Sequence, residues 1–165
     1  MRFRELLRED EASLWKALYH AIHVPPGQTA PPPEIVQQPE LARYVAGWKE
    51  PPDDLGMAAE ELGDIVGAAW LRRWAGDVQG YGFVDEETPE LSMAVWPGHR
   101  GRGVGTRLLR ELLDRASRRF DAVSLSVSLT NPARRLYERV GFEKIAPGPG
   151  DSVTMIRHFD DSALR

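Results

Sequence analysis

Residues 97–109 read Pro-Gly-His-Arg-Gly-Arg-Gly-Val-Gly-Thr-Arg-Leu-Leu, and this stretch decides the fold. A short apolar run at 91–96 leads into it and predicts a strand. After the glycines, apolar residues recur every three or four positions, which predicts a helix. They are Val104, Leu108, Leu109, Leu112, Leu113 and Ala116. The sequence therefore predicts a glycine-rich turn that joins the end of a strand to the start of a helix.

This turn has the properties of an anion-binding site. The first backbone N–H groups of a helix have no partner within the helix, and the helix dipole adds to their attraction for anions. Glycines at 101, 103 and 105 would let a phosphate approach the backbone closely. Two better-known phosphate loops do not fit. The chain has no Gly-Lys-Ser/Thr, which a P-loop needs, and Thr106 stands where a dinucleotide fingerprint needs its third glycine.

The distribution of charge supports a phosphorylated ligand independently. Residues 100–119 contain seven arginines and two acids, a net charge of +5, whereas the whole chain carries −4; subtracting the first from the second leaves −9 for the remainder. A basic segment in an acidic protein suits a phosphorylated ligand, although a solvated arginine-rich helix face would look the same. The acidic remainder argues against nucleic acid, which requires a broad basic surface.

A second informative segment, residues 131–142, reads Asn-Pro-Ala-Arg-Arg-Leu-Tyr-Glu-Arg-Val-Gly-Phe. Asn131 is a favourable N-cap, Pro132 a favourable first helical residue, and Gly141 a favourable residue just past a helix end. Four residues share one apolar face at helical spacing: Ala133, Leu136, Tyr137 and Val140. The segment therefore predicts a short amphipathic helix with Tyr137 directed toward the core.

The Arg-x-x-Gly-x-Gly motif at Arg100, Gly103 and Gly105, with the Asn…Leu-Tyr…Gly-Phe segment, resembles the GNAT superfamily of acyl-CoA-dependent N-acyltransferases. The resemblance implies an α/β (α+β) fold of three layers. Its central mixed, mostly antiparallel sheet would have about seven strands, two of them splayed apart, with helices on both faces. The resemblance extends over nearly the whole chain, so residues 1–165 are expected to form a single N-acetyltransferase domain.

The resemblance also implies a cofactor site for acetyl-CoA. The glycine-rich turn would hold the pyrophosphate, and the free backbone of the preceding strand would pair with the pantetheine arm. The implied cofactor-binding residues are Met93 and Val95 through their main chains, the loop residues Arg100, Arg102, Gly103, Gly105 and Thr106, and Asn131 beside the pantetheine arm. No metal is expected, because the four histidines are dispersed and cysteine is absent. The lack of cysteine also excludes a cysteinyl acyl-enzyme, so direct transfer between two bound substrates is expected.

Two side chains are expected to carry the chemistry. By resemblance, Tyr137 lies near the thioester sulfur, where its hydroxyl could protonate the departing thiolate. An amine acceptor must lose a proton before it attacks, and a carboxylate can accept that proton. The family often has a glutamate at the start of the splayed strand, so Glu90 is the first candidate base. The acidic run at 85–87 is either an alternative source of the base or a solvated loop, and the N–H of Val95 or its neighbour is expected to stabilise the oxyanion.

The function implied is transfer of an acetyl group from acetyl-CoA to a primary amine of a small cationic molecule. Two other functions remain open: acetylation of a protein N-terminus or lysine, and non-catalytic acyl-CoA binding. The family is frequently homodimeric. No apolar run is long enough to span a membrane, and acids interrupt the N-terminal segment where a secretion signal would be apolar, so a cytoplasmic enzyme is expected. By resemblance, the walls of the acceptor site would come from the proline-rich loop at 24–33 and from six aromatic residues, each of which could equally be core: Tyr44, Trp48, Trp70, Trp74, Tyr81 and Phe83.

The remaining elements follow from periodicity and from turn residues. Strands are expected at 1–7, 55–60, 65–74, 122–127, 142–145 and 152–156. Helices are expected after an Asp10 cap and within 34–48, separated by a proline-rich loop at 24–33. Residues 80–84 are expected to extend or follow the hairpin.

Overall fold

The structure is a computed structural model that describes residues 1–159; residues 160–165 of the expected domain lie outside the described part. The strands are β1 (Arg2–Glu5), β2 (Leu55–Glu61), β3 (Asp64–Arg72), β4 (Glu90–Val95), β5 (Ala122–Ser128), β6 (Glu143–Pro147) and β7 (Ser152–His158). The α-helices are α1 (Glu11–Ala21), α2 (Pro39–Ala42), α3 (Val104–Ala116) and α4 (Ala133–Arg139). Short 3-10 helices are η1 (Arg8–Asp10), η2 (Pro33–Gln37) and η3 (Pro97–His99).

The seven strands form one sheet in the order β1-β2-β3-β4-β5-β7-β6, which confirms the expected fold class. Every neighbouring pair is antiparallel except β4 and β5. β4 follows β3 along its whole length, from the Arg72–Glu90 pair to the Gly67–Val95 pair. In contrast, it pairs with β5 only through Glu90 and Ser124. β4 therefore separates from β5 directly after its first residue, as expected of a splayed pair.

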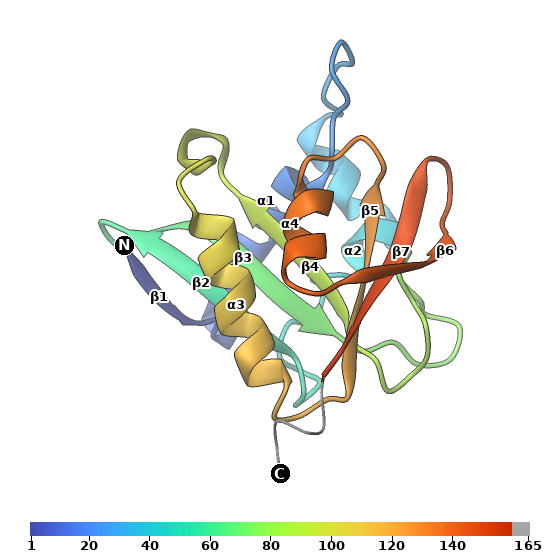
Figure 1. The fold of residues 1–165 in the computed structure, drawn as a ribbon. Coiled ribbons are helices and arrows are strands. Elements are labelled where there is room, and N and C mark those ends of the chain that lie inside the picture. Colours follow the sequence, from blue (N-terminus) through green and yellow to red (C-terminus); the bar gives the residue numbers. More distant parts are fainter. Residues whose placement is uncertain (160–165) are drawn as a thin grey trace.

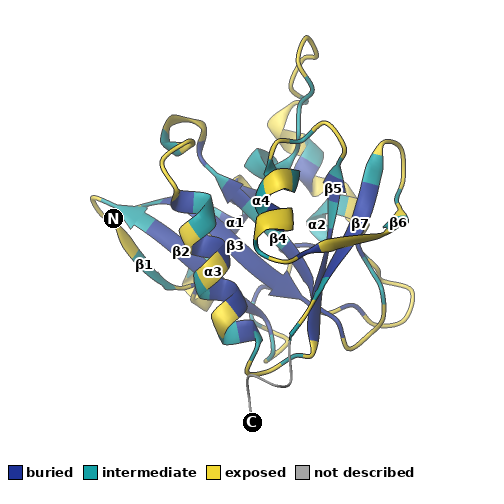
Figure 2. Ribbon diagram, in the orientation of Figure 1, coloured by how far each residue is buried: buried dark blue, intermediate teal, exposed yellow. Residues whose placement is uncertain are grey.

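Helices cover both faces of the sheet (Figure 1), with α3 and α4 on one face and α1 and α2 on the other. The apolar stripe predicted from the glycine-rich turn onward is the buried face of α3, while its opposite face is exposed (Figure 2). α3 packs closely on the sheet at Gly67, where a Cβ would lie 3.1 Å from Leu108 Cδ1 and 3.3 Å from the Ala94 carbonyl oxygen. This close packing fixes where α3 begins relative to β4.

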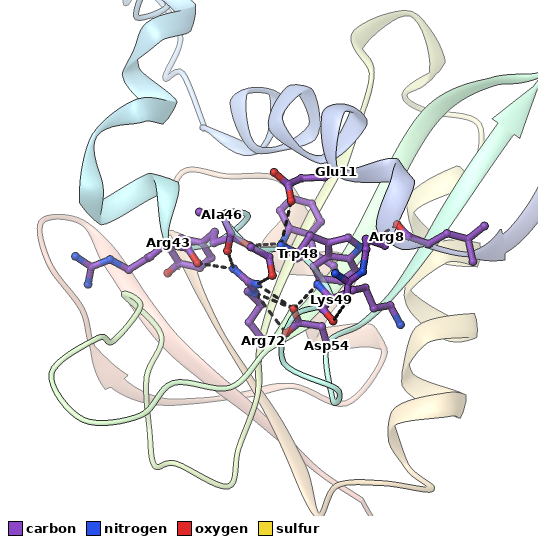
Figure 3. Close-up of polar contacts among 12 residues, drawn as sticks. Arg8, Glu11, Arg43, Ala46, Trp48, Lys49, Asp54 and Arg72 are labelled. Atoms are coloured by element: carbon purple, nitrogen blue, oxygen red, sulfur yellow. Dashed lines mark hydrogen bonds and ion pairs between the residues drawn. The ribbon is translucent and has the colours of Figure 1, made fainter.

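The helix expected within 34–48 is present but much shorter than that range. Residues 33–42 form only η2 and α2, and a series of turns follows through Lys49. Arg72 explains the difference, because its guanidinium binds the carbonyls of Arg43, Ala46 and Gly47 at 3.0, 2.7 and 3.0 Å (Figure 3). Backbone carbonyls that a continuous helix would use are thus bound by a side chain from β3.

Two other expectations are wrong. Residues 80–84 form a loop rather than a strand, because Gly82 lies against the backbone of β5: a Cβ there would be 2.6 Å from the Leu125 carbonyl carbon and 2.8 Å from the Ser126 nitrogen. Asp10 precedes α1 but does not cap it through its side chain. Its carboxylate instead accepts hydrogen bonds from Arg4, at 2.8 and 3.0 Å, and from the Leu7 N–H.

α4 carries a side-chain cap that allows a stability test. Asn131 Oδ1 accepts a hydrogen bond from the Ala133 N–H at 2.9 Å. We expect Asn131→Ala to lower the free energy of unfolding by about 1 kcal/mol, the usual cost of removing such a cap. Asn131→Asp keeps an oxygen acceptor and should retain most of the stability. Urea denaturation of the three proteins measures the difference, and equal midpoints for wild type and Asn131→Ala would contradict it.

Candidate active site

The N-terminus of α3 presents backbone N–H groups that are free of helix partners. The first helical bond is from the Arg107 N–H to the Gly103 carbonyl at 3.1 Å, so the N–H groups of residues 104–106 have no partner within the helix. Gly103 is the N-cap, with φ +80°, and Gly101 has φ +74°. Nothing lies within 4 Å of a Cβ built at either glycine. The loop therefore presents its backbone to open space in a conformation that favours glycine.

The open edge of β4 lies beside this loop. The Trp96 N–H bonds to Val66 of β3, so alternation along the strand turns the backbone groups of Met93 and Val95 toward β5. Within the described chain, β5 pairs with β4 only at the Glu90–Ser124 position and leaves that edge open. One backbone group on this edge already has a partner: the Val95 carbonyl accepts a hydrogen bond from Arg100 Nε at 2.9 Å. The Arg100 guanidinium is thereby held at the mouth of the opening.

Arg102 has a different environment from the one expected. It lies at the surface and pairs with Glu61 at 3.2 Å, and the same carboxylate lies 2.9 Å from His99 Nε2. These contacts lower the pKa of Glu61, with the Arg102 hydrogen bond as the main cause. The last residue of β2 thus contacts two residues of the glycine-rich loop, and the Arg102 guanidinium points to this carboxylate in the free protein.

Gly105 faces the space between the open strand and α4. A Cβ at this position would lie 3.6 Å from both the Met93 Cε and the Val95 Cγ2 atoms and 3.8 Å from Leu136 Cδ2. The half-buried Thr106 follows it in the first turn of α3. The open strand, the free N–H groups and this unfilled position therefore lie side by side, which is a suitable cradle for an extended ligand with a diphosphate group.

Tyr137 lies on the same face of the sheet, on α4. Its ring is buried and packs edge-on against Phe142, with 5.8 Å between ring centroids. Burial alone raises the pKa of Tyr137 to about 12, and no residue within 1–159 hydrogen-bonds to its hydroxyl. The hydroxyl is therefore protonated near neutral pH and available as a donor.

Glu90 lies on the opposite face, at the vertex where β4 and β5 meet. Its side chain is buried, and the residue is only 3% exposed. Oε2 accepts a hydrogen bond from the Tyr44 hydroxyl at 2.6 Å, and Oε1 accepts one from Trp74 Nε1 at 2.9 Å. The Gly82 N–H is a third donor. Burial raises the pKa of Glu90 above the usual glutamate range, while these three hydrogen bonds oppose the increase.

The sequence did not indicate the environment of Glu90, because its partners come from distant segments. Tyr44 is in the turns after α2, Trp74 lies just beyond β3, and Gly80 and Gly82 are in the loop before β4. A Cβ at Gly80 would collide with Glu90, Tyr44 and Trp74 together. Gly80 and Gly82 are the sequence feature that could have indicated this site, because glycine is needed where a backbone lies very close to other atoms.

The aromatic residues proposed as acceptor walls fall into two groups. Trp48 and Trp70 are each 1% exposed and belong to the core, and the indole of Trp70 donates to the Tyr44 carbonyl. Tyr81 is 44% exposed, stacks on Tyr44 with 6.5 Å between centroids, and donates its backbone N–H to the Tyr44 hydroxyl at 2.8 Å. Tyr81 is thus the aromatic surface nearest the Glu90 cluster that is open to solvent.

Most of the arginines in 100–119 do not serve the loop. Three of them, Arg107, Arg115 and Arg118, form i,i+4 ion pairs with acids on α3. Arg107 also lies over the Phe3 ring, 4.5 Å from its centroid. The basic segment is therefore partly a paired helix surface, and only Arg100 and Arg102 lie within the glycine-rich loop.

Residues 1–159 contain no group of three or more histidine, aspartate or glutamate side chains placed to hold a metal ion. Among the helices of the same range, none combines the length and apolar character that crossing a membrane requires.

Comparison with known proteins gives a family match over most of the chain. The model of the acetyltransferase (GNAT) family matches residues 15–142. An N-alpha-acetyltransferase, RimI of Mycobacterium tuberculosis, is 40% identical over 81 residues, which cover 44% of this chain and 50% of RimI. The L-methionine sulfoximine/L-methionine sulfone acetyltransferase of Salmonella typhimurium is 32% identical over 118 residues, covering 68% of this chain and 66% of that protein. An uncharacterised Mycobacterium leprae protein is 51% identical over 59 residues, only 16% of its length.

Solved structures share the fold. The yncA acetyltransferase of Salmonella typhimurium, solved with acetyl-CoA, superposes with a TM-score of 0.70 at 24% identity, covering 97% of this chain and 94% of that one. A ribosomal-protein-alanine N-acetyltransferase from Brucella melitensis superposes with a TM-score of 0.67 at 21% identity, covering 96% of this chain and 100% of that one. At these identities the similarity establishes the fold alone.

Proposed function

Because the chain belongs to the GNAT family of acetyltransferases, we propose that it transfers an acetyl group from acetyl-CoA to a primary amine. One observation supports this most directly: β4 separates from β5 after the single Glu90–Ser124 pair. Tyr137 and the glycine-rich loop lie on one face of the sheet beside this separation, and Glu90 lies on the other face. A thioester bound on the first face would thus meet an amine bound on the second.

The residues present fit acetyl-CoA. The free N–H groups of the first turn of α3 suit the pyrophosphate, and Arg100 and Arg102 supply positive charge beside it. Thr106 and the glycines at 103 and 105 complete that site. The backbones of Met93 and Val95 suit the amide groups of the pantetheine arm, with the side-chain amide of Asn131 as a further contact. When bound, the cofactor supplies the acetyl group as a thioester.

Each proton in the reaction has an assigned carrier. Glu90 accepts a proton from the acceptor ammonium, which leaves a neutral amine with a free electron pair. As the new C–N bond forms and the C–S bond breaks, the backbone N–H at or beside Val95 stabilises the negative charge on the carbonyl oxygen. Tyr137 donates its hydroxyl proton to the departing sulfur. The nitrogen carries two protons and a positive charge after the attack, and it loses the second proton to the tyrosinate through solvent, which restores Tyr137 and leaves a neutral amide. Glu90 releases its proton to solvent.

We favour a small cationic amine as the acceptor. The net charge outside residues 100–119 is negative, which attracts cations to the rest of the surface. The relative with the larger coverage, from Salmonella typhimurium, is named for small-molecule acceptors. RimI is named for acetylation of protein N-termini, which makes a peptide amine the second candidate.

A single assay tests the proposal and separates these acceptors. Release of free CoA from acetyl-CoA is followed with a panel of small amines, amino-acid derivatives and short peptides with free N-termini. We expect turnover with a small amine and little with peptides. Turnover with peptides alone would favour the second acceptor class. Binding of acetyl-CoA without transfer to any acceptor would overturn the enzymatic proposal in favour of an acyl-CoA-binding domain.

Tyr137→Phe tests the proposed acid. We expect kcat to fall by about 10- to 100-fold, a typical share for one positioned proton donor, while the Kd for acetyl-CoA changes by less than about twofold. The thermal midpoint should also be retained, because the hydroxyl has no hydrogen-bond partner within residues 1–159. Steady-state kinetics and calorimetry measure the two effects. Equal kcat values for both proteins would remove Tyr137 from the mechanism.

A further inference from the structure

The buried side chain of Glu90 has hydrogen-bond donors at both carboxylate oxygens. A carboxylate has about four acceptor positions. Here two are taken by side-chain donors, the Tyr44 hydroxyl and the Trp74 indole, and the Gly82 backbone makes a weaker interaction. Acceptor capacity therefore remains for a proton from the acceptor amine or from a bridging water.

The donors are themselves held rigidly from outside the site. The Tyr44 hydroxyl accepts from the Tyr81 N–H at 2.8 Å while it donates to Glu90, which fixes the direction of its proton. The Tyr44 carbonyl accepts from the buried indole of Trp70. The Tyr44 and Trp74 rings pack edge to face, with 5.1 Å between centroids. Neither donor can turn away from Glu90 without breaking a second contact.

Arg72 secures the backbone on which Tyr44 is carried. It binds the carbonyl of Arg43 directly before Tyr44 and those of Ala46 and Gly47 after it. Asp54, 1% exposed, holds Arg72 at 2.9 Å and also accepts from the Lys49 N–H (Figure 3). The Arg72–Asp54 ion pair thus fixes the conformation of the turns that place the Tyr44 hydroxyl beside Glu90.

We infer that Tyr44 and Trp74 are positioning residues of the proposed reaction, which favour the ionised form of the buried Glu90 and orient its carboxylate for the amine. The inference rests on the proposed role of Glu90 as base. Tyr44 is the titratable group in contact with Glu90, and Tyr81 stacks behind Tyr44; Arg72, the register partner of Glu90 on β3, directs its charge to Asp54 instead. Without the donors, a carboxylate in this site would take up a proton more readily and would lose its function as a base at lower pH.

Trp74→Phe removes a donor to Glu90 and keeps an aromatic ring in place. Trp15→Phe is its matched control, because it also removes an indole donor to a glutamate carboxylate: Trp15 Nε1 donates to Glu11 at 3.3 Å on α1, away from Glu90. Tyr44→Phe is a second test variant. For Trp74→Phe and Tyr44→Phe we expect kcat/KM to fall by about tenfold at the acidic end of the pH profile and to recover toward the alkaline end, since a hydrogen bond to a charged group is worth about 1.5–3 kcal/mol.

A second measurement does not depend on acetyl transfer. Carbon-13 NMR follows the titration of the Glu90 carboxyl, identified by the signal that Glu90→Gln removes. We expect this titration to move to higher pH in Trp74→Phe and Tyr44→Phe and to stay in place in Trp15→Phe. Wild-type titration in both test variants would overturn the inference. If the wild type transferred no acetyl group while the titrations moved as expected, the proposed function would fail and the donor role would stand.

Discussion

Glu90→Gln should lower kcat/KM by at least about 100-fold, the lower end of what a positioned general base contributes. Glutamine keeps the volume and one acceptor oxygen, so Trp74 or Tyr44 can still bond to it, but it cannot accept the proton of the ammonium. The loss should persist across the pH range, because no titratable group replaces the carboxylate. Kd for acetyl-CoA should change little, since Glu90 lies on the face opposite to the glycine-rich loop.

Glu86→Gln is the matched control for this variant. Glu86 is an exposed carboxylate four residues earlier, in the acidic run that competes with Glu90 for the role of base. Its substitution should leave kcat/KM within about twofold of wild type, as usual for an exposed side chain. The reverse result, a large loss in Glu86→Gln and a small one in Glu90→Gln, would place the base in the 85–87 run.

Local patterns were sufficient for much of the fold. The 3.6-residue repeat after the glycines correctly predicted α3, since one face of that helix packs on the sheet along its length. Alternation and turn residues correctly located the β2–β3 hairpin and β5. Asn131 as a start signal and Gly141 as an end signal correctly predicted the bounds of α4 to within a residue or two. In each case the determinants lie within the element itself or next to it.

The errors have non-local causes. No pattern within 34–48 reveals that Arg72, more than twenty residues later, binds three of its carbonyls. Similarly, the cluster around Glu90 joins residues 46, 16 and 8 positions away, so its donors could be recognised only after the chain had folded. The resemblance made Glu90 a candidate through its place at the start of β4, whereas nothing in the sequence predicted its contacts with Tyr44 and Trp74.

The second large effect should come from Gly105→Val. The valine methyl groups would extend into the space bounded by Met93, Val95 and Leu136, where the ligand must approach the N–H groups of α3. Each hydrogen bond lost to the charged diphosphate is worth about 1.5–3 kcal/mol, so the loss of one or two should raise Kd for acetyl-CoA by roughly 100-fold. Calorimetric titration with acetyl-CoA measures the change directly.

Gly98→Val separates this effect from a general disturbance of the loop. Gly98 lies in η3 of the same loop, does not have a left-handed φ, and has nothing within 4 Å of a built Cβ, so valine is accommodated there without strain. Its Kd should remain within about twofold of wild type. Gly105→Ala should fall between the two, because its Cβ meets its neighbours at ordinary contact distances in the free protein and only the ligand would be displaced. If all three variants bound acetyl-CoA as tightly as wild type, the diphosphate could not lie on the first turn of α3, and the acetyl-CoA site would have to be sought elsewhere.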